Sequence, residues 1–146
     1  MPDWSLRAAT AADARWIAEL RAVVLRADLE RLGRFDPARV RQRFLSAFDP
    51  AVTQVVVADG RDAGSIALRL EDRALWIEHF YLMPEFQGRG IGSRVLRAHL
   101  ASAPASRPFR LNMLQGSRAR ALYERNGFVV ESQDPVDVFM VRPPAW

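Results

Sequence analysis

"HFYLMPEFQGRGIGSRVL", residues 79–96, joins a run of aromatic and aliphatic residues to three closely spaced glycines and then to apolar residues at helical spacing. The first part is typical of a strand, and the last part is typical of a helix. The first amides of a helix have no partner within the helix, and glycine lets the backbone approach an anion closely. Residues 87–92 therefore predict an anion site, and phosphate is the anion that such a place commonly binds.

Two common classes of phosphate loop do not fit these residues. A P-loop requires a lysine followed by serine or threonine, and the chain contains no lysine. The dinucleotide fingerprint requires glycine or alanine three residues after Gly90, where Ser93 stands. It also requires a parallel strand–helix–strand unit, which the hairpins expected before the glycines do not supply. The sequence therefore disfavours both nucleotide-binding classes.

The rest of the chain alternates between helical and strand patterns. Turn signals separate β-branched and aromatic runs, which predict strands at 4–7, 52–58, 64–70, 75–83, 109–114, 128–132 and 136–142. Apolar residues at helical spacing, with capping and stop signals, predict helices from Thr10 to Leu32, from Pro37 to Asp49, from Ile91 to Leu100 and over 117–126. The three strands before the glycines are expected to be consecutive and antiparallel.

Three further features accompany the glycines. Gln87, Gly90 and Gly92 satisfy the pattern Gln or Arg, two residues, Gly, one residue, then Gly or Ala, and Leu82-Met83-Pro84 precedes them. Downstream, "ALYERNGF" (121–128) carries a tyrosine and closes with Gly-Phe. In these motifs and in the order of its elements, nearly the whole chain resembles the GNAT superfamily of acyl-CoA-dependent N-acetyltransferases.

The resemblance implies one GNAT-like domain over residues 1–146. Its fold would be α/β of the α+β type, with a mixed, mostly antiparallel central sheet of about seven strands flanked by about four helices. The implied reaction transfers an acetyl group from acetyl-CoA to a primary amine by direct attack within a ternary complex. Two parallel strands, 75–83 and 109–114, would splay to admit the acyl-pantetheine arm, and the Leu82 amide would hold the oxyanion.

The resemblance also implies which residues bind acetyl-CoA. The amides from Gly88 to Ser93 would cradle the pyrophosphate, with Arg89 or Arg94 assisting. The family commonly has an asparagine before the tyrosine helix, where this chain has Gly116 or Ser117, and Ser117 also suits the helix N-cap. The expected cofactor-binding residues are Phe80, Tyr81, Leu82, Gln87, Gly88, Arg89, Gly90, Ile91, Gly92, Ser93 and Ser117.

Two side chains are candidates for proton transfer. Tyr123 would protonate the departing CoA thiolate, because a phenol is protonated at neutral pH and a thiolate takes its proton downhill. Glu78 would accept the amine's proton, directly or through water, if regular strand alternation places it on one face with Phe80 and Leu82 and partial burial raises its pKa. His79 would then point to the opposite face as a packed or hydrogen-bonded residue.

The amino-acid composition disfavours several other classes of function. All 21 basic residues are arginine against 17 acids, a formal charge of +4 that fits an anionic ligand. In the densest arginine run, 31–44, Phe35 and Phe44 have the spacing of a buried stripe, which disfavours a nucleic-acid interface. The absence of cysteine and the two isolated histidines disfavour a metal site. With no apolar run of about 18 residues and no signal-peptide core, we expect a cytoplasmic protein without a membrane span.

Two alternatives stay open at this stage: a catalytically silent acyl-CoA-binding sensor and an arginine-rich nucleic-acid-binding module. Thiol release with an amine library separates the enzyme from the sensor, and salt-dependent binding to DNA or RNA would support the module. The acceptor, a small molecule or a peptide amine, has no motif that identifies it. We expect its site near residues 20–40 and 133–136, and we take a homodimer as the default assembly.

Overall fold

The computed structural model describes residues 3–104 and 106–144 of the chain, which form two compact units. Within the described residues, the first unit comprises 3–67 and 79–92, and the second comprises 68–78, 93–104 and 106–144. Strands β3 (Arg61–Glu71) and β4 (Ala74–Leu82) contribute residues to both units. The expectation that 1–146 is one domain stays a prediction.

The strands form a seven-stranded sheet with the order β1-β2-β3-β4-β5-β7-β6. The pairs β1–β2, β2–β3, β5–β7 and β6–β7 are antiparallel, and β4–β5 is parallel. This confirms the predicted mixed, mostly antiparallel sheet. The remaining strands are β1 (Trp4–Ala8), β2 (Thr53–Ala58), β5 (Phe109–Leu114), β6 (Val129–Gln133) and β7 (Asp137–Arg142).

Four α-helices lie in the described part of the chain, as predicted: α1 (Ala14–Arg31), α2 (Pro37–Ala47), α3 (Ile91–Ser102) and α4 (Ala119–Arg125). Short 3₁₀ turns that the sequence reading did not separate are η1 (Ala11–Asp13), η2 (Pro50–Val52) and η3 (Pro84–Phe86). The start of α2 follows its predicted signal, because the Asp36 carboxylate accepts from the amides of Ala38 and Arg39 at 3.1 and 3.0 Å.

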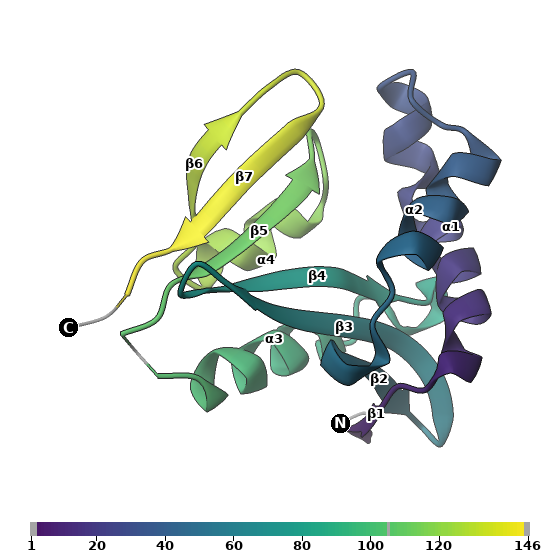
Figure 1. The fold of residues 1–146 in the computed structure, drawn as a ribbon, viewed down its shortest axis with the longest axis horizontal. Helices are drawn as coiled ribbons and strands as arrows, with labels where there is room; N and C mark the ends of the chain where they lie inside the picture. Colours follow the sequence, from purple (N-terminus) through teal and green to yellow (C-terminus); the bar gives the residue numbers. More distant parts are fainter. Residues whose placement is uncertain (1–2, 105, 145–146) are drawn as a thin grey trace. The chain divides into compact units, whose positions relative to one another are not determined.

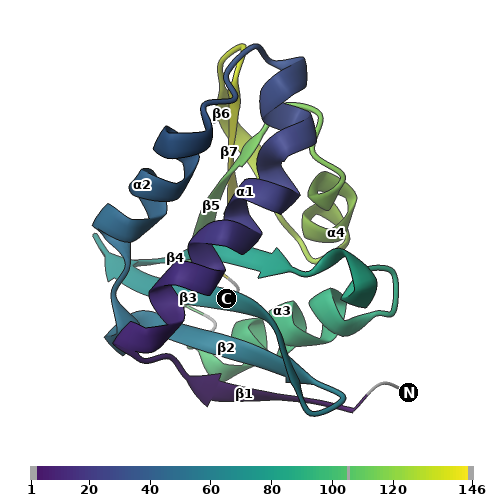
Figure 2. The same cartoon turned by 90° about the vertical axis from the view of Figure 1, so that its right-hand side faces the viewer.

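In the first unit, α1 and α2 lie side by side (Figures 1 and 2). Ile17 and Phe44 are fully buried between them, and Tyr81 of β4 packs against this cluster. Gly64 of β3 is buried against the backbone of Tyr81, where a Cβ would collide with the Tyr81 carbonyl oxygen. Close approach of two backbones therefore requires glycine at position 64.

In the second unit, β5, β7 and β6 form an antiparallel ribbon that is visible in Figure 1. Phe109, Leu111 and Met113 alternate as buried residues along β5, as expected for a strand with one covered face. The parallel ladder between β4 and β5 joins Leu75 to Phe109 and Trp76 to Arg110.

Candidate functional site

The glycine loop (residues 87–92) leads from the end of β4 and the η3 turn into the first turn of α3. Gly88 and Gly90 have φ of 76° and 81°, in the left-handed region that glycine adopts without a steric penalty from a Cβ. The Gln87 side chain donates through Nε2 to the Leu82 carbonyl at 2.9 Å. The loop is thus tied to the last residue of β4 by a side chain of its own sequence motif.

The surroundings of the loop suit an anion. A Cβ added at Gly88 would meet nothing within 4 Å, whereas one at Gly92 would lie 3.5 Å from Leu82 Cδ1 and 3.9 Å from Phe80 Cζ. The Ile91 side chain is fully buried and anchors the first turn of α3. Residues 87–97 contain three arginines and no acid. Helix amides, open glycines and a positive local charge together fit a phosphate group.

The cations beside the loop already have protein partners. Arg89 lies 3.6 Å from the Asp59 carboxylate and 5.5 Å from the ring centre of Phe86. Arg97 donates to the Ser93 hydroxyl at 2.8 Å. The Arg89 side chain is 49% exposed, so it can reach solvent at the loop while it remains close to Asp59.

Strand β4 changes conformation at His79, which has a φ of 50° and is not glycine. The His79 ring contacts the Phe44 ring edge-on at 4.9 Å, and its Nδ1 lies 3.3 Å from the Tyr81 hydroxyl. That hydroxyl also accepts from Arg21 Nε at 3.0 Å. The prediction that His79 is a packed, hydrogen-bonded residue is confirmed, and Tyr81 shares its face of the strand.

The geometry expected for Glu78 needs a correction. The left-handed residue at position 79 interrupts regular alternation, so alternation does not place Glu78 on one face with Phe80 and Leu82. Both Glu78 carboxylate oxygens accept from Arg69, at 2.8 and 3.2 Å, and this hydrogen bonding raises the pKa of Arg69. Its side chain is 34% exposed, and its carboxylate is therefore a partly solvated, ion-paired group.

The second unit holds the other predicted site residues, Ser117 and Tyr123. Gly116 has a φ of 80°, and the Ser117 hydroxyl accepts from the Ala119 amide at 3.2 Å, although the N-cap position itself is occupied by Arg118 and not by Ser117. Helix α4 begins at Ala119, two residues later than predicted. The Tyr123 side chain is buried, with its ring 5.6 Å from that of Phe128 in an edge-on arrangement.

Sequence reasoning missed the two arginines that hold predicted site residues. Arg69 lies 9 positions before Glu78, and Arg21 lies 60 positions before Tyr81. The strand pattern supplies a weak signal for the first, because residues of adjacent strands across a tight turn face one another. Nothing local indicates the second, since Arg21 is one arginine among many on a helix.

Residues 51–130, more than half of the chain, match the family described as "Acetyltransferase (GNAT) domain". The chain belongs to the GNAT acetyltransferase family. No curated protein sequence matches this GNAT protein. None of the helices in the described ranges is long and apolar enough to cross a membrane.

Solved structures share the fold of this GNAT protein at low sequence identity. The PaiA N-acetyltransferase from Thermoplasma acidophilum in complex with coenzyme A has a TM-score of 0.75 and 19% identity, with 97% of this chain and 99% of that chain covered. The ribosomal-protein-S18-alanine N-acetyltransferase from Escherichia coli has a TM-score of 0.72 and 14% identity, with coverage of 99% and 96%. These likenesses establish the seven-stranded GNAT fold.

Proposed function

We propose that this GNAT protein transfers an acetyl group from acetyl-CoA to a primary amine by direct attack in a ternary complex. The observation that carries the proposal is the glycine loop, in which left-handed Gly88 and Gly90 lead into the first turn of α3. Amides at a helix start favour phosphate oxygens, and coenzyme A carries a pyrophosphate. Acetyl-CoA, when bound, supplies a thioester whose acyl carbon an amine can attack.

The loop and the end of β4 hold the cosubstrate in this proposal. Amides from Gly88 to Ser93 donate to phosphate oxygens, and Arg89 adds positive charge. Gln87 fixes the Leu82 carbonyl and with it the end of β4, so that the Leu82 amide can donate to the acyl oxygen. The other expected contacts are Phe80, Tyr81, Ile91 and Ser117.

Tyr123 and Glu78 handle protons in this proposal. The Tyr123 hydroxyl gives its proton to the sulfur as the carbon–sulfur bond breaks. Glu78, hydrogen-bonded to Arg69, accepts the proton that the amine loses, through a water molecule where the distance requires one. Both residues lie in the second unit, and the glycine loop lies in the first.

Thiol release from acetyl-CoA in the presence of a broad panel of primary amines tests the proposal. The expected result is amine-dependent release of free thiol, together with saturable binding of acetyl-CoA by calorimetry. Binding without release over the whole panel would identify a silent sensor of acyl-CoA. The absence of binding would contradict the role of the glycine loop.

A further inference from the structure

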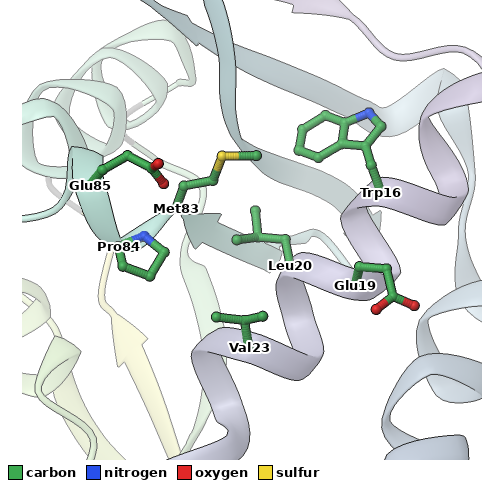
Figure 3. A pocket seen from close by; sticks show the side chains of 7 residues that line it. All are labelled: Trp16, Glu19, Leu20, Val23, Met83, Pro84 and Glu85. Carbon is green, nitrogen blue, oxygen red and sulfur yellow. The ribbon is translucent and has the colours of Figure 1, made fainter.

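A pocket of about 330 Å³ lies between one stripe of α1 and the residues that directly follow β4. Figure 3 shows the side chains of Leu20 and Val23 facing the Met83–Pro84 segment, with the indole of Trp16 at one end. Glu19 and Glu85 complete the lining. All seven residues belong to the first unit. The volume is at the lower end of the 300–1,000 Å³ that is typical of ligand pockets, so the pocket suits one small group.

The lining of the pocket suits an apolar group. Val23 is 58% exposed, and its aliphatic side chain forms part of the wall. The Trp16 indole donates through Nε1 to the Asp13 carboxylate at 2.8 Å, which holds the ring in place. A fixed aromatic wall and an exposed aliphatic side chain favour a ligand that buries hydrocarbon surface.

The two carboxylates at the margin do not make this a cation site. Glu19 accepts from Arg41 Nε at 2.7 Å and from Nη2 at 3.0 Å, so both its oxygens are engaged. The Glu85 carboxylate lies 3.6 Å from Arg61. Because each carboxylate has an arginine partner, the margin has little net charge. The pocket therefore suits the uncharged body of a ligand better than an ammonium group.

The pocket also has a defined place relative to the glycine loop. The Leu82 side chain lies against Gly92 at the start of α3, whereas the next residue, Met83, contributes to the pocket beside α1. Met83 is extended, with φ of −57° and ψ of 142°, and its amide donates to the Ala63 carbonyl at 2.8 Å. Successive side chains of an extended segment point to opposite sides. The pocket thus lies across the end of β4 from the glycine loop.

We infer that this pocket binds the apolar body of the acceptor and selects primary amines that carry an aromatic or branched aliphatic group. The inference rests on the proposed function, in which the glycine loop and the Leu82 amide hold acetyl-CoA. Met83 directly follows Leu82 in the chain. In this inference, an apolar group bound between Val23 and Met83 therefore brings the attached amine near the acyl carbon that the Leu82 amide would hold. The same chemistry is offered by a free arylalkylamine and by a peptide with an apolar N-terminal residue.

The first experiment compares kcat/KM for phenethylamine and ethylamine, which share a primary amine and differ in the apolar body. Burial of an aromatic group favours phenethylamine by about 10- to 100-fold. Val23→Asp places a charge in the wall and Val23→Trp fills the space, so both variants bring the ratio close to one. Leu45→Asp is the matched control, because Leu45 is a 40% exposed apolar residue on α2 outside the pocket lining, and it keeps the wild-type ratio.

The second experiment separates this inference from the proposed function. Calorimetric titration of the protein with phenethylamine, without acetyl-CoA, should show binding that Val23→Asp removes, even if no amine is ever acetylated. One outcome would overturn the inference and leave the proposed function intact: ethylamine is acetylated, but phenethylamine is neither preferred as a substrate nor bound. A Val23-dependent preference for hexanoyl-CoA over acetyl-CoA would also overturn it, because the pocket would then hold the acyl chain. Phe-Ala-Ala and Gly-Ala-Ala peptides, assayed in parallel, distinguish a peptide acceptor from a free amine.

Discussion

Gly90 adopts a left-handed conformation, with φ of 81°, at the point where the chain enters α3. Gly90→Val is expected to abolish binding of acetyl-CoA in calorimetry. A β-branched residue is strained at this φ, and its side chain would intrude where a phosphate must approach. Gly33→Val is the matched control, because Gly33 also has a positive φ, of 70°, in open space at the end of α1. A folded Gly90→Val protein with native affinity would remove the glycine loop from the proposal.

Tyr123 has a structural role that must be separated from its proposed chemical one. Tyr123→Phe keeps the ring that packs on Phe128 and removes the hydroxyl alone. We expect kcat to fall by about 10²- to 10⁴-fold while the affinity for acetyl-CoA stays nearly constant. Steady-state and single-turnover kinetics check this, and thermal unfolding shows whether packing is intact. An unchanged single-turnover rate would show that the hydroxyl is structural.

The role of Glu78 is tested with two variants, because its carboxylate is hydrogen-bonded to Arg69. Glu78→Gln removes the proton acceptor and its ion pair, whereas Arg69→Gln keeps the Glu78 carboxylate and removes the ion pairs of Arg69 with Glu78 and Glu71. If Glu78 is the base, the first variant loses most of kcat and its pH–rate profile changes, while the second keeps most of its activity. Measurement of kcat against pH for both proteins decides the matter. Equal losses of kcat in the two variants would indicate that Glu78 acts only through its ion pair with Arg69 and does not accept a proton.

At the scale of elements, one carboxylate joins β1, η1 and α1. Asp13 is buried and accepts from Arg7 at 2.8 and 3.0 Å, from the Thr10 amide at 2.8 Å and from the Trp16 indole at 2.8 Å. These hydrogen bonds, the one from Arg7 foremost, hold the pKa of Asp13 well below its ordinary value. Because the folded-state pKa is depressed, the carboxylate contributes stability above the unfolded value of about 3.9, and this contribution is lost as pH falls below it.

Asp13→Asn is therefore expected to lower the free energy of unfolding by about 2 kcal/mol at pH 7, since an amide cannot accept all of these hydrogen bonds. The difference from wild type should shrink at pH 3, where the wild-type carboxyl begins to lose its advantage. Urea denaturation at both pH values measures this. Asp36→Asn is the control, because asparagine caps a helix about as well as aspartate does. Equal stability of wild type and Asp13→Asn at pH 7 would contradict the assignment.

The elements that the sequence predicted best are those with local signals. The Asp36-Pro37 pair predicted the start of α2, and the alternating apolar and polar residues at the start of FRLNML predicted β5 at residues 109–114. The left-handed conformation of His79 had no such signal, because histidine at this position reads as an ordinary strand residue. The regular alternation assumed for Glu78 therefore does not hold at this point, and its role as a base stays a prediction. A sequence motif shared with a family can locate a loop, but it does not predict that the side-chain alternation of the adjacent strand is interrupted.

At the scale of the whole molecule, the sequence indicated candidate site residues through short local motifs, but it did not indicate their surroundings. The glycine loop and the Tyr123 helix are short motifs, so each could be read within a few residues. The pocket between α1 and Met83–Glu85 joins segments about 60 residues apart, and its apolar character depends on ion pairs to Arg41 and Arg61. Contacts of this kind arise from tertiary packing, which one sequence without its relatives does not encode in any local pattern.

The proposed mechanism also makes a prediction for the protein as a whole, because direct transfer requires acetyl-CoA and the amine to be bound at the same time. Initial rates with both substrates varied should give intersecting double-reciprocal lines, as expected for a ternary complex, and not the parallel lines of a ping-pong reaction. The chain has no cysteine and no lysine, so neither thiol nor side-chain amine can carry the acetyl group. Intact-protein mass spectrometry after incubation with acetyl-CoA alone should show an unchanged mass. A burst of free thiol with a stable acetyl adduct would point to another nucleophile, such as a serine, and would contradict direct transfer.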